Sequence, residues 1–551
     1  MVTTRRASAA KAAAATGSTS GGTSPPAADH RALYKRTSIA RTPAELKQRR
    51  MAIDESLRKK HREQLITAKR YRNLNRQEEL ESAGEEDPLA DKNDDDGIII
   101  IYAGYIYVIL TRILSEEISP YYRLSTAQVE ALAKDLSSDD KATRIEAAQH
   151  IGKFVLEPAK ALIKYITEGD CIKTLTHMIS GSNLDEQTEA AQTISNIAAG
   201  SYDLWIKSVS TVPYLISLLD SDNMNLREIA AGALGNMAAE DLGDMNDEDD
   251  KVRAKIRDNG AIKPLVRMLD SQDVRLIQSA CFALANLARG QEAQLSEFFT
   301  TGLTDKLLKH LSNQDTATEV CWVVSYLTAG SEKFRQEVME KNFGPPLVSD
   351  LATLADQGPV VLPVLRTLGN LAGTEAFLKR LAEQEQFLRS VVALTKSDQS
   401  RVVKKEALWV LSNITSSQDP EIIKQVEDLH AIDNLTDLVG RGAFDIRKGA
   451  AYCIMNIANH GPEHLDKLAH KQLLPAFLEL LKSQDADMMR LGLGYIELLL
   501  TQATHGKQII DSVPDCMEAL AAVAPAPDPE LFALANRLVD QYFGESPDMK
   551  E

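Results

Sequence analysis

The chain has 551 residues and a formal net charge of −17, and its 44% hydrophobic and 26% charged residues are typical of a globular protein with a large core. It contains no phosphate-binding loop and no GxSxG, dinucleotide or HExxH motif, which argues against an enzyme and against a bound cofactor or metal. The cysteines lie far apart and form no CxxC pair, so they fit buried thiols in a reducing compartment better than disulfides. They are Cys171, Cys281, Cys321, Cys453 and Cys516.

Residues 1–29 are rich in Ala, Ser, Thr, Gly and Pro and have almost no large apolar side chain. Such a segment buries too little surface to offset the entropy lost on ordering, so we expect a disordered tail. Its few basic residues and its lack of acid before Asp29 also fit an organelle transit peptide, and this alternative stays open at this point.

Residues 30–76 form a basic arm with 15 Lys and Arg against 4 Asp and Glu. Thr42 to Glu45 form a capping box with Pro at the first helical position, which predicts the start of a helix. Its thin apolar stripe favours an acidic partner over packing within its own domain, and the alternative is a disordered basic tail. Residues 77–551 carry a net charge of −30, so we expect the arm and the body to attract each other. An acidic body without a basic stripe is not expected to bind nucleic acid directly.

Residues 77–119 combine an acidic linker with the apolar run 98–110, IIIIYAGYIYVIL. These 13 uncharged residues are fewer than the roughly 18 to 20 that span a bilayer, so we expect no membrane anchor. An insertion, or non-coding sequence that has been translated, is the preferred interpretation. An additional apolar element docked on the first repeat and an aggregation-prone strand remain alternatives.

Residues 120–545 alternate helical segments with short polar loops, and residues 546–551 form a tail. Seven segments end alike, with Asn, or once Tyr, at one position. We call these ladder residues: Asn196, Asn236, Asn286, Tyr326, Asn370, Asn413 and Asn456. Their spacings of 40, 50, 40, 44, 43 and 43 residues are typical of armadillo and HEAT repeats, and the longest spacing holds the acidic insertion 240–250. We therefore predict an all-α solenoid of about ten repeats, in which one helix per repeat lines a concave surface.

The segment from Arg401 to Ser416 indicates what this surface offers. Trp409 lies four residues before Asn413, so both share one helix face, and Glu406 joins them. An amide can bond the backbone of an extended peptide, while aromatic rings and acids accommodate the stems and charges of Lys and Arg. The alternative is that each Asn only ties one repeat to the next, because buried polar groups need partners. Six Asn at one register favour a peptide-binding groove.

With these features the chain resembles the importin-α (karyopherin-α) family over nearly its whole length. The arm sequences SLRKKHREQL and AKRYRN, Arg366 in PVLRTLGN, Tyr326 in CWVVSYLTAG and the closing segment 529–545 carry the resemblance. It implies a right-handed armadillo superhelix and an adaptor for basic nuclear localisation signals that shuttles between cytoplasm and nucleus. The implied partners are an importin-β-type carrier, basic cargo proteins and a nuclear export factor for recycling.

The resemblance also implies two peptide sites in the groove and two functional clusters in the arm. The minor site would comprise Arg366, Asn370, Glu406, Trp409, Asn413, Tyr452 and Asn456. The major site would comprise Asn196, Gly200, Asn236, Glu240, Phe282, Asn286 and Trp322. The carrier would bind Arg49, Arg50, Arg58, Lys59 and Lys60, and in its absence Lys69, Arg70 and Arg72 would occupy the groove as an autoinhibitory cluster.

The major site departs from the family pattern. We call the residue four positions before each ladder residue the wall position, because the family has aromatic side chains there. Gln192 and Gly232 occupy two of the three wall positions of the major site, and Gly449 replaces an acid near Tyr452. These changes leave two alternatives open: an armadillo scaffold that keeps the arm but no longer transports cargo, and a membrane-associated protein anchored by residues 98–110.

Overall fold

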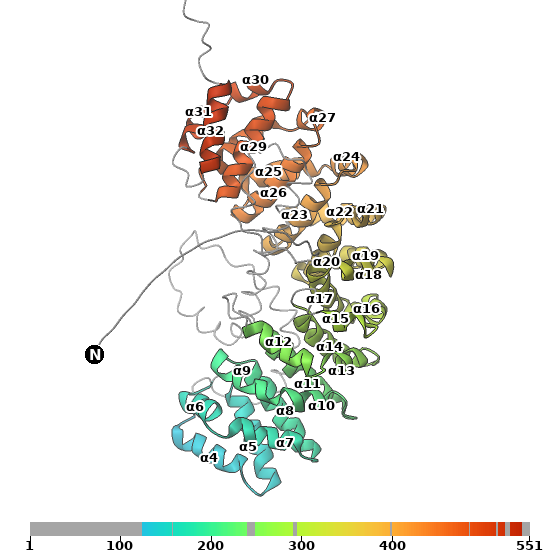
Figure 1. Ribbon diagram of the computed structural model, residues 1–551, viewed down its shortest axis with the longest axis vertical. Coiled ribbons are helices and arrows are strands. Elements are labelled where there is room, and N and C mark those ends of the chain that lie inside the picture. The colour runs from blue at the N-terminus through green and yellow to red at the C-terminus, as the bar shows by residue number, and fades with distance from the viewer. Residues whose placement is uncertain are drawn as a thin grey trace, which may run out of the picture.

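The computed structural model describes residues 124–156, 158–239, 248–289, 295–396, 399–483, 485–513, 516–523 and 529–542. Within these ranges the chain forms helices and no strand. Figure 1 shows the helices as one curved stack that runs from α4 to α32. The prediction of an all-α solenoid is confirmed.

After the opening pair α4 (Thr126–Leu136) and α5 (Lys141–Phe154), the helices follow in groups of three. The third helix of each group, together with α5, is called a ladder helix below. The other ladder helices are α8 (Leu184–Ala198), α11 (Met224–Ala239), α14 (Val274–Leu287), α17 (Gln314–Gly330), α20 (Leu362–Ala372), α23 (Arg401–Thr415), α26 (Phe444–Ala458), α29 (Ala486–Gln502) and α32 (Pro529–Tyr542).

The first and second helices of each group are shorter than its ladder helix, except that α19 is as long as α20. The first helices are α6 (Lys160–Glu168), α9 (Tyr202–Ser208), α12 (Glu248–Asp258), α15 (Ser296–Phe299), α18 (Glu332–Glu340), α21 (Glu375–Ala382), α24 (Pro420–Asp428), α27 (Pro462–Leu465) and α30 (Gly506–Asp511). The second helices are α7 (Cys171–Ser180), α10 (Val212–Leu218), α13 (Ile262–Met268), α16 (Leu303–Leu311), α19 (Gly344–Leu354), α22 (Glu385–Ala393), α25 (Ala431–Arg441), α28 (His470–Leu481) and α31 (Cys516–Ala522). Two 3₁₀ turns, η1 (Val209–Thr211) and η3 (Gly358–Val361), precede α10 and α20.

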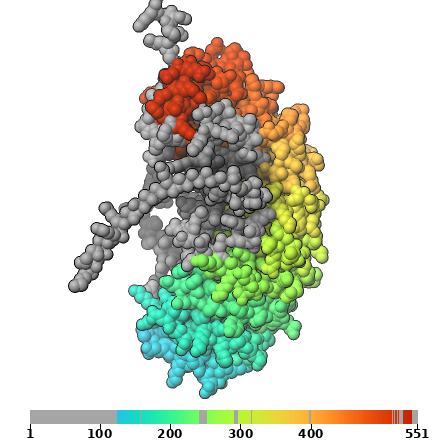
Figure 2. All heavy atoms as spheres, in the orientation of Figure 1, coloured from blue at the N-terminus to red at the C-terminus, as the bar shows by residue number. Residues whose placement is uncertain are grey.

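Each ladder helix packs against the ladder helix of the next repeat, from α5 against α8 to α29 against α32. In Figure 1 the ladder helices α11, α14 and α17 lie inward, whereas α10, α13 and α16 form the outer edge of the curve. Figure 2 shows the same curved body as a continuous band along the chain. The stack therefore places equivalent residues of successive repeats side by side.

A short polar turn starts several ladder helices. Ser271 Oγ accepts from the backbone N–H of Asp273 at 3.0 Å, and Asp273 then caps α14 by accepting from the N–H of Arg275 at 2.9 Å. Ser and Asp at such positions satisfy N–H groups that a helix start leaves without a partner. The same turn recurs at Ser138 with Asp140 and at Ser483 with Asp485. It explains why the second helix of a repeat ends and the ladder helix begins within a few residues.

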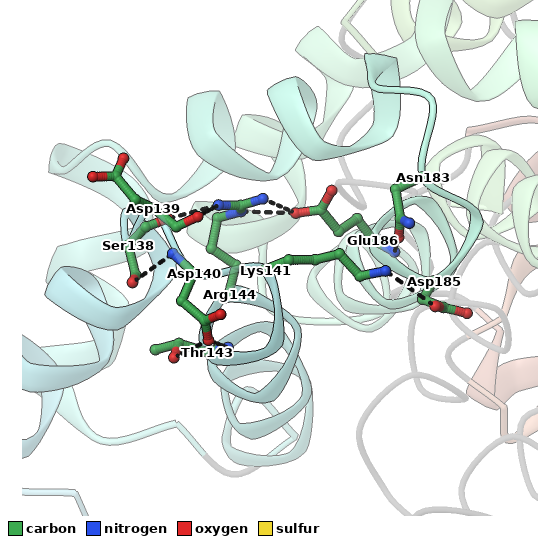
Figure 3. A network of polar contacts seen from close by, with 9 residues as sticks. All are labelled: Ser138, Asp139, Asp140, Lys141, Thr143, Arg144, Asn183, Asp185 and Glu186. Atoms are coloured by element: carbon green, nitrogen blue, oxygen red, sulfur yellow. Dashed lines mark hydrogen bonds and ion pairs between the residues drawn. The ribbon is translucent and has the colours of Figure 1, made fainter.

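Ion pairs join the starts of neighbouring ladder helices. Figure 3 shows Arg144 at the start of α5 between the loop carbonyl of Ser138 and the carboxylate of Glu186 on α8. The Arg144 Nε donates to Glu186 Oε1 at 2.7 Å, and Lys141 pairs with Asp185 at 3.6 Å beside it. The first pair is largely shielded from solvent, so it orients the first two ladder helices more firmly than the exposed second pair.

The apolar core runs through the whole stack without interruption. The prediction that the five cysteines are buried thiols is confirmed, because all five are buried and none forms a disulfide. Burial raises the pKa of the Cys171 thiol to about 12 and those of Cys281 and Cys321 well above their ordinary value. These thiols therefore pack as small apolar groups.

Candidate peptide-binding groove

The ladder residues lie on the inward helices, one per repeat, each one turn after its wall position. Because consecutive ladder helices pack directly on one another, the ladder residues form a line from α8 to α26. The wall residues form a second line beside it. We call α8, α11 and α14 the N-terminal half of this groove, and α20, α23 and α26 the C-terminal half.

Most ladder Asn residues bond to the preceding ladder helix. The Nδ2 group donates to a backbone carbonyl from Asn196 to Gly152 at 3.0 Å, from Asn236 to Ser195 at 3.3 Å, from Asn370 to Ser325 at 3.0 Å, from Asn413 to Gly369 at 3.0 Å and from Asn456 to Ser412 at 2.8 Å. In four of these five bonds the accepting residue stands immediately before the previous ladder residue. Asn286 differs, because its Nδ2 donates to Phe282 of its own helix at 3.0 Å.

The ladder Asn residues therefore do tie repeat to repeat, as the structural alternative expected. Each of these amides can form further hydrogen bonds, because a carboxamide has two N–H donors and a carbonyl that can accept two hydrogen bonds. At Asn456 the buried Oδ1 accepts no hydrogen bond within the described part of the chain. A buried acceptor without a hydrogen-bond partner is uncommon in folded proteins.

Two glycines form the floor beneath aromatic wall residues. A Cβ added at Gly369 on α20 would overlap the Cζ3 of Trp409 on α23. A Cβ added at Gly235 on α11 would stand 2.5 Å from Phe282 of α14, closer than real side chains approach. Each glycine immediately precedes a ladder Asn, so the bare backbone lets the ring of the next repeat lie flat beside the ladder. This role was not predicted, although both glycines occur in a Leu-Gly-Asn segment that could have indicated it.

Arg366 occupies the wall position of α20 and joins three ladder helices. Its guanidinium lies 5.3 Å from the ring centroid of Trp322 on α17, and its Nη2 is 3.1 Å from Glu406 Oε1 on α23. Trp322 in turn stacks on Tyr326 with ring centroids 5.8 Å apart. Glu406, expected to face a cargo cation, is therefore already paired with a cation of its own chain.

The N-terminal half is built differently. The Gln192 Nε2 donates to Asn196 Oδ1 at 3.1 Å, so the amide carbonyl of this ladder residue already accepts a bond from its own helix. At Gly232 a Cβ would meet no atom of the described residues within 4 Å. Phe282 is the aromatic wall residue that remains in this half. Gly200, expected at the major site, has the Leu204 side chain of α9 3.0 Å from the point where its Cβ would stand, and its role in peptide binding stays a prediction.

Several predicted residues lie outside the described residues and stay predictions. They are Glu240 and the arm residues Arg49, Arg50, Arg58, Lys59, Lys60, Lys69, Arg70 and Arg72. The apolar run 98–110 lies outside them too. Within the described ranges, no helix is both long enough and apolar enough to cross a membrane.

Two titratable groups near the ladder helices have shifted pKa values. Burial on α19 raises the pKa of Asp350 to about 6, and its Oδ2 has no hydrogen-bond partner within the described ranges. Burial lowers the pKa of His460, whose Nε2 lies 3.0 Å from the carbonyl of Thr415 at the end of α23. Both groups stand beside the groove helices and belong to the scaffold that supports them.

Comparison with known proteins agrees with this architecture. The model of the armadillo/beta-catenin-like repeat matches residues 204–239, from within α9 to the end of α11, and residues 249–289, from within α12 to just past α14. A crystal structure of an engineered protein from the Northeast Structural Genomics Consortium superposes with a TM-score of 0.64 at 25% identity, covering 77% of this chain and 100% of that one.

Two plant proteins match most of the sequence. Importin subunit alpha-9 of Arabidopsis thaliana is 28% identical over 425 residues, which is 73% of this chain and 80% of that protein. Importin subunit alpha-2 of Oryza sativa subsp. japonica is 28% identical over 449 residues, which is 77% of this chain and 83% of that protein. The similarity covers about three quarters of this chain, at a level of identity that leaves room for individual sites to differ.

Proposed function

We propose that this chain, a divergent relative of the importin α subunits, is a nuclear import adaptor that binds basic signal peptides in its ladder groove. The relationship to importin α subunits supports the adaptor role as a whole. The cargo would be proteins that carry basic nuclear localisation signals, and the arm, residues 30–76, would join them to an importin-β-type carrier. The protein would shuttle between cytoplasm and nucleus, with an export factor returning it.

The observation that carries this proposal is the C-terminal half of the groove. Asn370, Asn413 and Asn456 hold equivalent orientations there, because each donates to a carbonyl of the preceding ladder helix. Trp409 and Tyr452 stand one turn before two of them. An extended peptide laid across the helices would exchange backbone hydrogen bonds with the amides and place Lys or Arg stems against the rings.

The charge distribution supports an intramolecular competition. The arm has 15 Lys and Arg against 4 Asp and Glu, whereas the whole chain has a net charge of −17. A basic segment tethered to an acidic body has a high effective concentration at the groove, so it competes with cargo until another protein binds it. Binding of the carrier to the arm would thereby open the groove.

Deletion of the arm tests this arrangement directly. We expect the chain without residues 1–76 to bind a fluorescein-labelled basic peptide more tightly than the full chain does, because Lys69, Arg70 and Arg72 no longer compete. Anisotropy titrations at one salt concentration measure both affinities. Equal affinities would remove autoinhibition from the proposal, and the absence of binding to either protein would overturn the groove function itself.

One observation favours a second candidate, a scaffold that no longer transports basic cargo. The bond from Gln192 to Asn196 uses an acceptor at the first ladder position of the N-terminal half. If both halves had changed in this way, the groove would tie repeats together and do nothing else. The retained walls of the C-terminal half favour the adaptor, and the same titration separates the two candidates.

A further inference from the structure

The wall positions of α11 and α20 have the same surroundings but different contents. On α20, Arg366 stands three residues before Gly369, the floor of Trp409. On α11, Gly232 stands three residues before Gly235, the floor of Phe282. Residues three apart share one side of a helix, so in both cases the wall position lies beside the aromatic ring of the next repeat.

The wall position holds a side chain in one case and none in the other. On α20 the Arg366 guanidinium lies over the Trp322 ring of the preceding ladder helix, 3.1 Å from Glu406. On α11, apart from the neighbours of Gly232 and the backbone of its own helix, no atom of the described residues lies within 4 Å of the point where a Cβ would stand. The neighbouring wall residue, Gln192, is turned along its own helix to Asn196 and presents no aromatic face. The slot around Gly232 is therefore wider than one with two aromatic walls.

We propose that the N-terminal half of the groove selects an extended peptide with an aromatic side chain at the position that faces Gly232. The inference rests on the proposed peptide-binding function. A lysine stem between two aromatic walls touches both, but here it would touch Phe282 alone. A flat ring fills the wider slot and gains an aromatic pair with Phe282. The ladder residues Asn236 and Asn286 would still bond the peptide backbone on either side.

The ladder amides and the net charge of the chain favour an aromatic residue within a basic peptide over a free aromatic molecule. The flanking ladder amides offer backbone-type donors and acceptors at successive repeats, which only a chain of residues can engage together. The net charge of −17 favours a chain that is basic elsewhere. The selected ligand is thus a basic segment interrupted by one aromatic residue.

The test uses the full chain with Trp409→Ala and Asn413→Ala, which weaken the C-terminal half so that binding reports the N-terminal half. The labelled parent peptide has the sequence Gly-Gly-Lys-Lys-Arg-Lys-Gly-Gly. Four further peptides each replace one basic residue with Trp. We expect one Trp peptide to bind about twofold to tenfold more tightly than the parent, the range that one aromatic pair provides. The arm weakens all peptides alike, so the ratio of two affinities is unaffected by its competition.

Substitution of Gly232 tests whether the preference for a Trp peptide arises at this slot. In Gly232→Trp the slot is filled from within, and the preference should return to the all-basic parent. Gly440→Trp is the control for the added side chain, because Gly440 on α25 is also a helical glycine whose Cβ would meet nothing within 4 Å, although Gly440 is exposed and Gly232 is buried. Gly232→Leu and Gly440→Leu repeat the comparison with a smaller side chain, should the Trp variant not fold.

Each outcome decides one point. If no Trp peptide exceeds a parent that binds, the inference is overturned and the proposed function stands. If the preference persists in the folded Gly232 variants, or disappears in the Gly440 variants, the slot has been misplaced and the inference is again overturned. If no peptide binds even to the chain that keeps Trp409 and Asn413, the proposed function fails together with it.

Discussion

Trp409 lies directly on the backbone of Gly369, 40 residues earlier in the chain, and the fit leaves no room for a Cβ. The carbonyl of the same glycine accepts the 3.0 Å hydrogen bond from Asn413. One backbone position of α20 thus supports both the aromatic wall and the ladder amide of α23. The geometry of the C-terminal half depends on it.

Gly369→Ala should therefore destabilise the protein and weaken peptide binding together. The added methyl group displaces the Trp409 ring, and overpacking of this kind costs about 1 to 3 kcal/mol. The better helix propensity of Ala offsets up to about 1 kcal/mol of this. Urea denaturation measures the stability, and titration with a basic peptide measures the binding.

Gly232→Ala is the control for that variant, because its methyl group enters open space. Here the helix propensity acts alone, so we expect an unchanged or raised stability, by up to about 1 kcal/mol. If the two alanine variants behave alike, the contact between Trp409 and the α20 backbone does not govern the groove.

Because the carboxyl group of Asp350 is partly buried, we expect the stability of the protein to depend on pH. Its pKa is raised by burial from 3.8 to about 6, so the folded state binds its proton more tightly than the unfolded state does. The stability this group contributes is full below pH 3.8 and is lost as the pH rises through 6. Asp350→Asn should match the wild type at pH 4 and be the more stable protein at pH 7.5, by a modest amount because the group is only partly buried.

Thermal denaturation at the two pH values tests this expectation. Asp356→Asn makes the same change in net charge at an exposed position of the following turn and is the control. An equal gain in both variants at pH 7.5 would assign the effect to the overall negative charge of the chain. Only a gain confined to Asp350→Asn supports the burial of its carboxylate.

Features that depend on the geometry of a single helix, or on the spacing of equivalent helices, could be predicted from the sequence. The spacing of the ladder residues predicts the stack, and the four-residue step from Trp409 to Asn413 places both on one face, since both follow from helical geometry. The bond between Gln192 and Asn196 obeys the same step and could have been predicted.

Contacts between repeats were not predictable in the same way. The partner of Glu406 is Arg366, 40 residues away, and the ring above Gly235 comes from Phe282, 47 residues away. Nothing local in the sequence says which side chain of the next repeat will lie over a given glycine or beside a given acid. The same holds for the ladder amides, whose carbonyl partners lie on the preceding helix.

The arm should bind an importin-β-type carrier through its charge. Reversal of Arg49, Arg50, Arg58 and Lys59 to Glu leaves the arm with 11 basic and 8 acidic residues in place of 15 and 4, so we expect carrier binding to be abolished. Raised salt should weaken the wild-type interaction, because exposed charges are screened. Pull-down of the carrier by the isolated arm measures both effects, and retained affinity after charge reversal would exclude an electrostatic arm.

The two halves of the groove should differ in their affinity for an all-basic peptide. Gln192 and Gly232 remove two aromatic walls from the N-terminal half, and each lost cation–π contact costs roughly 0.5 to 2 kcal/mol. At about 1.4 kcal/mol per factor of ten, the loss lowers the affinity of that half on the order of tenfold or more. The C-terminal half keeps Trp409 and Tyr452.

Trp409→Ala with Asn413→Ala should therefore reduce the binding of a peptide with a single basic cluster more than Asn236→Ala with Phe282→Ala does. Each pair removes one ladder amide and one aromatic ring that rests on a glycine, which is Trp409 in one pair and Phe282 in the other. The cost to folding is therefore matched between the halves. Circular dichroism checks that both variants fold, and titration on the chain without residues 1–76 compares their affinities at one salt concentration. If Asn236→Ala with Phe282→Ala reduces peptide binding more, the ladder amides suffice to bind a basic peptide without aromatic walls. The N-terminal half, which contains Gln192 and Gly232, is then the stronger site for basic cargo.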